Sequence, residues 1–130
     1  MPEENPVAAL VTAAEAVRQQ LRVNAFDAAA VQRLAELIEE QRPTIKEAER
    51  QGVITALGCF LGQCMVEVYQ GEWATGRDGT TGVGINGVNF FNPFFRVSEQ
   101  LTKGLDQSVA TFFASVPERL AAQPSRKTWI

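Results

Sequence analysis

Histidine is absent from the 130-residue sequence, and only two cysteines are present. Without histidine, the chain can form neither a zinc site of the usual Cys/His type nor a proton relay through imidazole. Cys59 and Cys64 are five residues apart in one predicted helix, where their side chains diverge by about 140°, so no bond between them is expected. Their apolar surroundings predict small buried side chains instead of reactive thiols. We therefore predict no metal and no cofactor.

The sequence also lacks an excess of positive charge. Lysine and arginine number 12 against 15 acidic residues, which gives a net charge of −3. Because the basic residues are scattered along the chain, we predict no nucleic-acid partner. The mild acidity would suit a basic protein partner, although so small a net charge gives little steering.

A long uninterrupted apolar run is missing as well. The longest one, Val53 to Val68, contains Thr55, Gln63 and Glu67 and falls short of the roughly 20 apolar residues of a membrane span. We therefore predict no membrane association. The N-terminus, Met1 to Glu4, lacks the basic and then apolar pattern of a secretory signal, which predicts a cytoplasmic protein.

Two helices are predicted in the first third of the chain. The first begins at the Asn5-Pro6 cap and extends to Leu21, with its apolar residues on one face. Asp27 can cap the second helix, which ends before Pro43. The short connection between them favours antiparallel packing.

A third, longer helix is predicted from the residues that follow. Thr44 to Glu47 matches a capping box, in which the threonine and glutamate side chains bond to orphan backbone amides. From Val53 to Tyr69 the residues are apolar on nearly all sides, as expected of a helix at the centre of a small domain. Glu67 in this segment needs a partner if it is buried. Arg96 or Lys103 could supply one, and a structural ion pair is favoured over a catalytic acid.

Glycine and aromatic residues between Gly71 and Pro93 change the pattern to that of strands. Asn86-Gly87 between alternating residues is a strong hairpin signal, because both turn positions need a positive φ. A second turn is predicted at Gly76–Gly79. The strands are expected to form a three-stranded antiparallel meander: Trp73–Thr75, Thr81–Ile85 and Val88–Phe91.

Gly82 to Gly87 also matches the G-x-G-x-x-G pattern of dinucleotide-binding loops. That fingerprint needs a helix that opens within the glycines, whereas the strand-like residues Val88 to Phe91 follow the third glycine. The sequence therefore predicts a hairpin here and not a phosphate site.

Two helices are predicted after the sheet. Asn92-Pro93 repeats the cap-and-proline start. Asp106 can cap the last helix, in which Pro117 either ends the helix or opens a weak further turn. Residues 123–130 are predicted to be a mobile tail. Residues 1–130 are thus expected to form a single α+β domain: a helical N-terminal half with a long central helix, the meander, and two C-terminal helices.

Four segments and the hairpin between them carry a resemblance: Gly58-Cys59-Phe60-Leu61-Gly62-Gln63, Tyr69-Gln70-Gly71-Glu72-Trp73, Asn92-Pro93-Phe94 and Asp106-Gln107-Ser108-Val109. In these residues the second half of the chain resembles a group of small uncharacterised bacterial proteins. In that group, a glycine-rich helix leads to a Gly-x-Trp strand, a short sheet, a Phe/Pro step and a final helix. Relatives of this kind occur near secretion and toxin loci, so the resemblance implies an accessory or immunity-type role without an assigned activity or catalytic residues.

Aromatic residues around the sheet mark the predicted binding surface. Alternation along a strand sends Phe90 and Phe91 to opposite faces, and helical spacing separates Phe94 from Phe95. Some of these rings must be covered by another helix, a partner or a ligand. We predict no catalytic set but several candidate binding residues: Glu67, Glu72, Trp73, Arg77, Asn89, Phe91 and Phe95.

The sequence supports three functional hypotheses. The leading one is a non-enzymatic protein-binding or accessory module that recognises another protein, or a second copy of itself, through the sheet and its aromatic flank. The alternative is a small-molecule binder with an aromatic pocket between the central helix and the sheet. The third is an enzyme that uses Glu67 or Glu72 with Arg77.

Overall fold

The structure of the chain, a computed structural model, describes residues 6–87 and 89–121. Val88 and the predicted tail at 123–130 lie outside these residues. Helices and strands follow one another in this order: α1 (Pro6–Leu21), α2 (Ala28–Gln41), α3 (Glu47–Tyr69), β1 (Glu72–Thr75), β2 (Thr81–Ile85), β3 (Asn89–Phe91), α4 (Pro93–Lys103), the 3-10 helix η1 (Gly104–Gln107) and α5 (Val109–Ala121). The strands pair antiparallel in the order β1-β2-β3. This confirms the predicted α+β class with a long central helix and a three-stranded meander.

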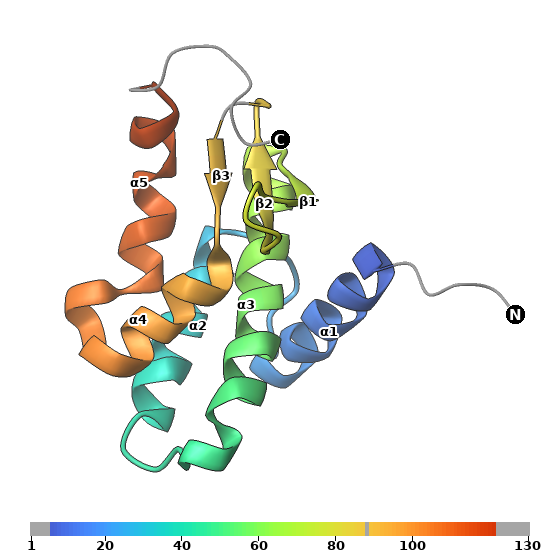
Figure 1. Cartoon of the computed structure of the whole chain (residues 1–130). Coiled ribbons are helices and arrows are strands. Elements are labelled where there is room, and N and C mark those ends of the chain that lie inside the picture. The colour runs from blue at the N-terminus through green and yellow to red at the C-terminus, as the bar shows by residue number, and fades with distance from the viewer. Residues whose placement is uncertain (1–5, 88, 122–130) are drawn as a thin grey trace, which may run out of the picture.

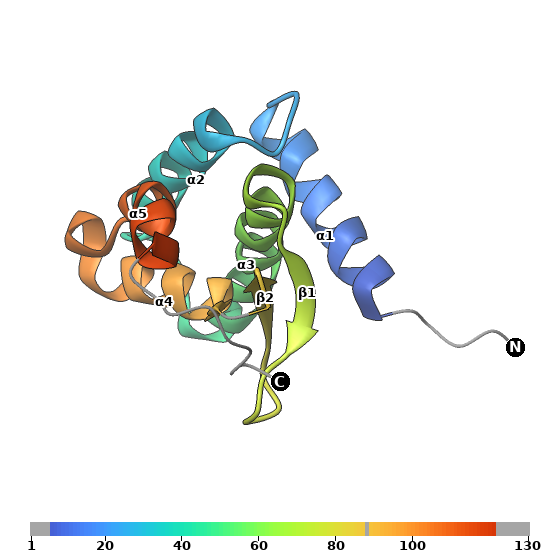
Figure 2. The ribbon, with the colours of Figure 1, turned by 90° about the horizontal axis from the view of Figure 1, so that it is seen from above.

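The helix α3 runs through the middle of the molecule, and the small sheet lies beside its C-terminal end (Figure 1). α1 packs on one side of α3, and α2, α4 and α5 gather on the other (Figure 2). By length and composition alone α3 could also cross a membrane, contrary to our expectation from its polar interruptions. However, 56% of the apolar 18-residue stretch of α3 that meets this criterion is buried inside the fold. The central position of α3 therefore accounts for apolar residues on nearly all its sides.

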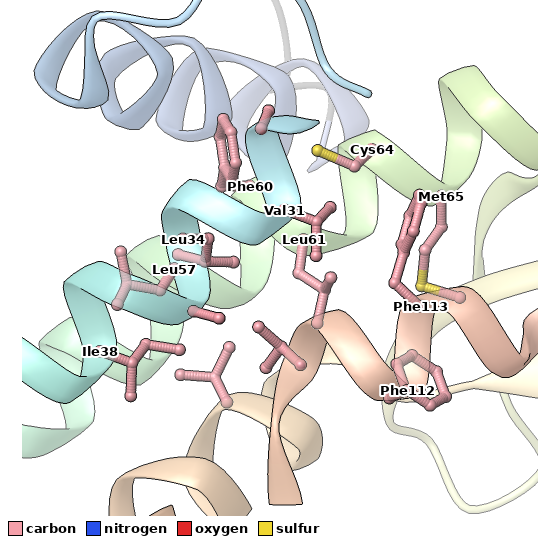
Figure 3. Close-up of a cluster of buried hydrophobic side chains, with 14 of the residues drawn as sticks. Val31, Leu34, Ile38, Leu57, Phe60, Leu61, Cys64, Met65, Phe112 and Phe113 are labelled. Carbon is pink, nitrogen blue, oxygen red and sulfur yellow. The ribbon is translucent and has the colours of Figure 1, made fainter. Parts of the chain in front are cut away.

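The core surrounds α3 and takes buried residues from α1, α2, β2, α4 and α5. Figure 3 shows part of this core around α2, α3 and α5. Leu34 of α2 and Phe60 of α3 have no exposed surface, and Phe113 of α5 is 2% exposed. Cys64 lies in the same core, Cys59 is also buried, and neither forms a disulfide. Burial raises the pKa of both thiols, because an apolar environment disfavours the thiolate. The prediction of buried, unpaired cysteine side chains is confirmed.

The start of α3 differs from the predicted capping box. The helix begins at Glu47, and the carboxylate of Glu49 accepts a hydrogen bond from the backbone N–H of Lys46 at 3.3 Å. Thr44 is not the cap, because its N–H and its hydroxyl both donate to the carbonyl of Gln41 in a turn that closes α2. The cap position is therefore Lys46 instead of the predicted Thr44, and α3 begins at Glu47.

The other local signals around α2, α4 and the hairpin are confirmed. The side-chain oxygen of Asp27 accepts a hydrogen bond from the N–H of Ala30 at 2.9 Å, and that of Asn92 accepts from Phe95 at 3.0 Å. At the hairpin turn Asn86-Gly87, both residues have a positive φ, of 63° and 70°. These conformations are the ones that the favoured two-residue turn requires.

The predicted cap of α5 is wrong. Asp106 lies inside the 3-10 helix η1, and the hydroxyl of Ser108 accepts a hydrogen bond from the N–H of Ala110 at 3.1 Å instead. The chain makes an extra turn after Gly104, which moves the start of α5 to Val109. An aspartate and a serine two positions apart are both good caps, so the pattern alone did not decide between them.

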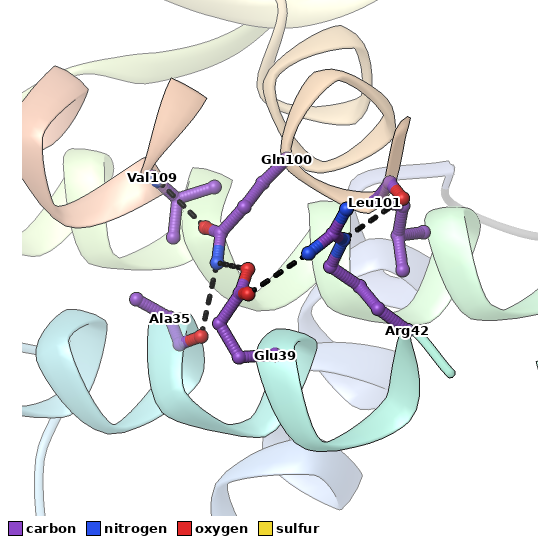
Figure 4. A network of polar contacts seen from close by, with 6 residues as sticks. All are labelled: Ala35, Glu39, Arg42, Gln100, Leu101 and Val109. Carbon is purple, nitrogen blue, oxygen red and sulfur yellow. Dashed lines mark hydrogen bonds and ion pairs between the residues drawn. The ribbon is translucent and has the colours of Figure 1, made fainter. Parts of the chain in front are cut away.

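A buried glutamine joins α2, α4 and α5 (Figure 4). Gln100 of α4 has no exposed surface. Its amide nitrogen donates to the carbonyl of Ala35 at 3.0 Å and to the carboxylate of Glu39 at 2.8 Å. Its amide oxygen accepts from the N–H of Val109 at 2.9 Å, and Glu39 also pairs with Arg42 at 3.1 Å. This network holds α4 and α5 in place against α2.

Pro117 neither ends α5 nor opens a new turn, because the helix continues through it to Ala121. Proline has no N–H, so the carbonyl of Phe113, four residues earlier, lacks its helical partner. The hydroxyl of Tyr69, at the end of α3, donates to this carbonyl at 2.6 Å. A tyrosine hydroxyl is protonated at neutral pH and can donate, and burial raises the pKa of Tyr69 further.

We expect Tyr69→Phe to lower the free energy of unfolding by about 1–2 kcal/mol, because the carbonyl of Phe113 then lacks a donor. In a Pro117→Ala background the new alanine N–H can bond the same carbonyl, so Tyr69→Phe should cost less. Urea unfolding of the four proteins in this cycle measures the coupling. An equal cost of Tyr69→Phe in both backgrounds would contradict the pairing.

Candidate functional site

Trp73, Gln63 and Glu67 form a chain of side-chain hydrogen bonds. The indole N–H of Trp73 donates to the amide oxygen of Gln63 at 3.0 Å, and the amide nitrogen of Gln63 donates to the carboxylate of Glu67 at 3.0 Å. Glu67 is exposed, and its partner is neither Arg96 nor Lys103 as predicted. Gln63 stands one helical turn away on the same face of α3, and it satisfies the carboxylate without a cation.

Two glycines of α3 make room for aromatic rings. A Cβ at Gly58 would lie within 3.0 Å of three ring atoms of Phe94, and a Cβ at Gly62 would lie within 3.0 Å of three ring atoms of Trp73. The two ring centres are 6.2 Å apart. Trp73 and Phe94 thus occupy the space along α3 near the sheet, where the alternative hypothesis placed an aromatic ligand pocket.

Three of the predicted binding residues lie at separate positions of the sheet. Glu72 is exposed at the start of β1, Arg77 is exposed in the turn between β1 and β2, and Asn89 begins β3. Within residues 6–87 and 89–121, no hydrogen bond or ion pair joins Arg77 to Glu67 or Glu72. The constellation of the enzyme hypothesis is therefore not assembled there.

A cluster of arginine and phenylalanine side chains lies on α4 and α5. We call it the arginine–aromatic surface and define it as Phe95, Arg96, Phe112 and Arg119. The guanidinium carbon of Arg96 is 4.3 Å from the ring centre of Phe112 and 5.9 Å from that of Phe95, and the guanidinium carbon of Arg119 is 5.5 Å from the ring centre of Phe112. These are the distances of cation–π contacts. Phe91 joins the cluster from β3, with its ring centre 5.8 Å from that of Phe112.

The arginine–aromatic surface has a buried base and an open edge. Phe112 is 5% exposed, whereas Phe95 is 52% exposed. Arg96 lies between them and is partly buried. Aromatic and arginine side chains are enriched in protein–protein interfaces relative to the rest of a protein surface. The open edge therefore has the composition of a binding surface.

The two arginines of this surface have no acidic partner in the part of the chain that the structure describes. Neither side chain forms an ion pair there, and Arg119 donates a hydrogen bond to the hydroxyl of Ser115 at 2.8 Å. Burial lowers the pKa of Arg96, the charge of Arg119 lowers it further, and the carboxylate of Glu99 opposes both effects. Two like charges thus share one aromatic ring without a bound carboxylate.

A hollow of about 120 Å³ lies beside the two guanidinium groups. Its wall combines two cations, three hydroxyl groups and one carboxylate: Arg96, Arg119, Ser108, Thr111, Ser115 and Asp106. Guanidinium groups only donate, and hydroxyl groups can donate as well as accept. A small anionic group in this hollow would therefore meet more donors than acceptors.

The sequence pointed to Phe91 and Phe95 but not to the two arginines as binding residues. Arg119 follows Phe112 by seven residues in one helix, and this spacing places both on one face. The position of Arg119 beside Phe112 could therefore have been predicted from the sequence. The approach of Arg96 to the same ring could not, because it depends on how α4 packs against α5.

Among the described residues, no group of three or more histidine, cysteine, aspartate or glutamate side chains is placed to hold a metal ion. No family model matches the chain, and neither a curated protein nor a solved structure is significantly similar to it. The resemblance to small bacterial proteins therefore stays a prediction, and the geometry of the arginine–aromatic surface carries the functional proposal.

Proposed function

We propose that this protein is a non-enzymatic binding module that recognises an acidic segment of another protein through the arginine–aromatic surface. One observation carries the proposal: two arginines contact the ring of Phe112, with no carboxylate paired to either in the described chain, next to the half-exposed ring of Phe95. A few arginine and aromatic side chains supply most of the affinity in many interfaces. This surface offers both kinds side by side.

The chemistry of the surface favours a carboxylate-rich partner. A guanidinium group held against a ring presents its N–H donors in a fixed plane that matches the two oxygens of a carboxylate. An incoming carboxylate would also relieve the repulsion between Arg96 and Arg119. The net charge of −3 alone suggested a basic partner, but the local charge at this surface is positive, and local charge decides the contact.

The biological setting is also part of the proposal. An accessory or immunity-type role in a bacterial cytoplasm, the kind of role that the resemblance implies, would need such a module and no catalytic residues. A second copy of this acidic chain is the other partner that fits the leading hypothesis. The oligomeric state, measured by analytical ultracentrifugation, distinguishes self-association from binding to a different protein.

We expect a fluorescein-labelled peptide of glutamates around one tryptophan to bind the folded protein, and Arg96→Gln/Arg119→Gln to weaken that binding about tenfold or more. Glutamine keeps much of the side-chain length and removes the charge. Binding should also weaken as salt is added, because the contact is between charges. Fluorescence anisotropy measures both effects.

Arg33→Gln on α2 is the matched control. The side chain of Arg33 is 38% exposed and lies near the carboxylates of Glu36 and Glu40 at 3.5 and 3.7 Å. Its loss changes the net charge without touching the arginine–aromatic surface. If Arg33→Gln weakens peptide binding as much as the double variant does, the attraction is a general charge effect and the proposal fails.

A further inference from the structure

A groove separates α1 from α2 over the N-terminal half of α3. α1 and α2 lie on either side of α3 (Figure 2), and the groove between the three helices has a volume of about 540 Å³. Volumes of roughly 300–1,000 Å³ are typical of sites for small molecules. The groove shares no lining residue with the arginine–aromatic surface.

The lining of the groove is apolar at its base and polar at its rim. Leu21 of α1, Leu37 of α2 and Val53 of α3 contribute apolar side chains. The polar lining residues are one cation, one carboxylate and two amides: Arg33, Glu49, Gln20 and Gln41. An apolar base with a few polar groups is the usual composition of a small-molecule site. Arg33 forms two long ion pairs, with Glu36 at 3.5 Å and with Glu40 at 3.7 Å. Exposed pairs of this kind contribute little to stability, so an anionic ligand can compete for the guanidinium group.

Gly52 of α3 lies in this groove and has no structural explanation within the described chain. A Cβ at Gly58 or Gly62 would collide with an aromatic ring, whereas a Cβ at Gly52 would meet no atom within 4 Å. Glycine inside a helix is less stable than alanine, so its presence needs a compensating reason. What Gly52 provides is a stretch of bare helix backbone facing an open groove.

We propose that this groove binds a small planar aromatic molecule whose ring lies over Gly52, as the rings of Phe94 and Trp73 lie over Gly58 and Gly62. In this proposal three glycines of α3 each leave room for an aromatic ring: Gly58 and Gly62 for the side chains of Phe94 and Trp73, and Gly52 for the ligand. The guanidinium group of Arg33 at the rim suits an anionic substituent on that ligand. This site is independent of the proposed protein-binding function.

The probe is 1-anilinonaphthalene-8-sulfonate, which combines planar aromatic rings with one anionic group. We expect saturable binding at one site of the folded protein, read from dye fluorescence. Gly52→Phe fills the groove with a side chain, so the dye affinity should fall about tenfold or more. Thermal unfolding should show that Gly52→Phe is at least as stable as the original protein, because its Cβ meets no atom within 4 Å and phenylalanine is a better helix former than glycine.

Gln51→Phe is the control, because Gln51 is exposed on the same helix and does not line the groove. It should bind the dye as the original protein does, and Gly52→Phe should still bind the acidic peptide at the arginine–aromatic surface. Amide NMR spectra with and without dye locate the contact at residues of α1, α2 and α3. Absence of saturable dye binding, or equal binding by the original protein and Gly52→Phe, overturns the proposal.

Discussion

Replacing Gln100 by leucine is expected to lower the free energy of unfolding by about 2–3 kcal/mol, because the change removes three hydrogen bonds and leaves the buried N–H of Val109 without an acceptor. Gln100 has no exposed surface and makes three hydrogen bonds. Leucine keeps a similar volume, so the loss reports on hydrogen bonding more than on packing. The largest part should come from the N–H of Val109, which is also fully buried and loses its acceptor.

The position of Gln100 makes the effect larger than that of an ordinary side-chain hydrogen bond. Its partners lie on α2 and at the start of α5 (Figure 4), so the substitution removes contacts that join three helices. Glu39 keeps its ion pair with Arg42 and is not left alone. The expected loss is therefore that of one orphaned amide and a weakened helix junction.

Gln32→Leu is the control for this change. Gln32 lies on α2 and is exposed, so its replacement should shift the free energy of unfolding by no more than about 0.5 kcal/mol. Urea unfolding of both variants, followed by circular dichroism, gives the comparison. If Gln100→Leu is as stable as Gln32→Leu, the buried network does not hold α4 and α5 as described.

The second large effect is expected at Gly62. Gly62→Ala should lower the free energy of unfolding by about 1–3 kcal/mol, because the added methyl group overpacks a filled site. A Cβ at this position falls within 3.0 Å of three atoms of the Trp73 ring. Trp73 cannot move away freely, since its indole N–H is bonded to Gln63 at 3.0 Å.

Gly52→Ala on the same helix is the control, and its expected change in the free energy of unfolding has the opposite sign. No atom lies within 4 Å of a Cβ there, so the substitution should raise the free energy of unfolding by about 0.5–1 kcal/mol, the intrinsic preference of a helix for alanine. Thermal and urea unfolding compare the two variants. A similar change in both would mean that Trp73 does not pack against Gly62.

The sequence was sufficient for the fold class and for most elements, because those signals are local. Asp27 and Asn92 cap the predicted helices, and Asn86-Gly87 forms the predicted turn. Local signals did not decide which of several nearby residues caps a helix. Thr44 and Asp106 are good caps by residue type, but Thr44 lies in the turn that closes α2 and Asp106 lies inside the 3-10 helix η1.

The candidate sites were harder to predict, because they depend on packing between distant segments. The pattern separates Phe94 from Phe95 but does not decide which ring lies outside the core, and the structure leaves Phe95 52% exposed. Arg96 and Arg119 are 23 residues apart in the sequence and come together through the ring of Phe112. The groove over Gly52 depends on the separation of α1 and α2, which no local pattern fixes.

The most direct test of the account is an NMR titration of the labelled protein with the glutamate-rich peptide, followed at the side-chain Nε–Hε signals of the arginines. The account predicts that the signals of Arg96 and Arg119 shift together and saturate at the same peptide concentration, while that of Arg33 stays in place. If all arginine signals shift alike, or if those of Arg96 and Arg119 do not move while the peptide binds, the arginine–aromatic surface is not the binding site.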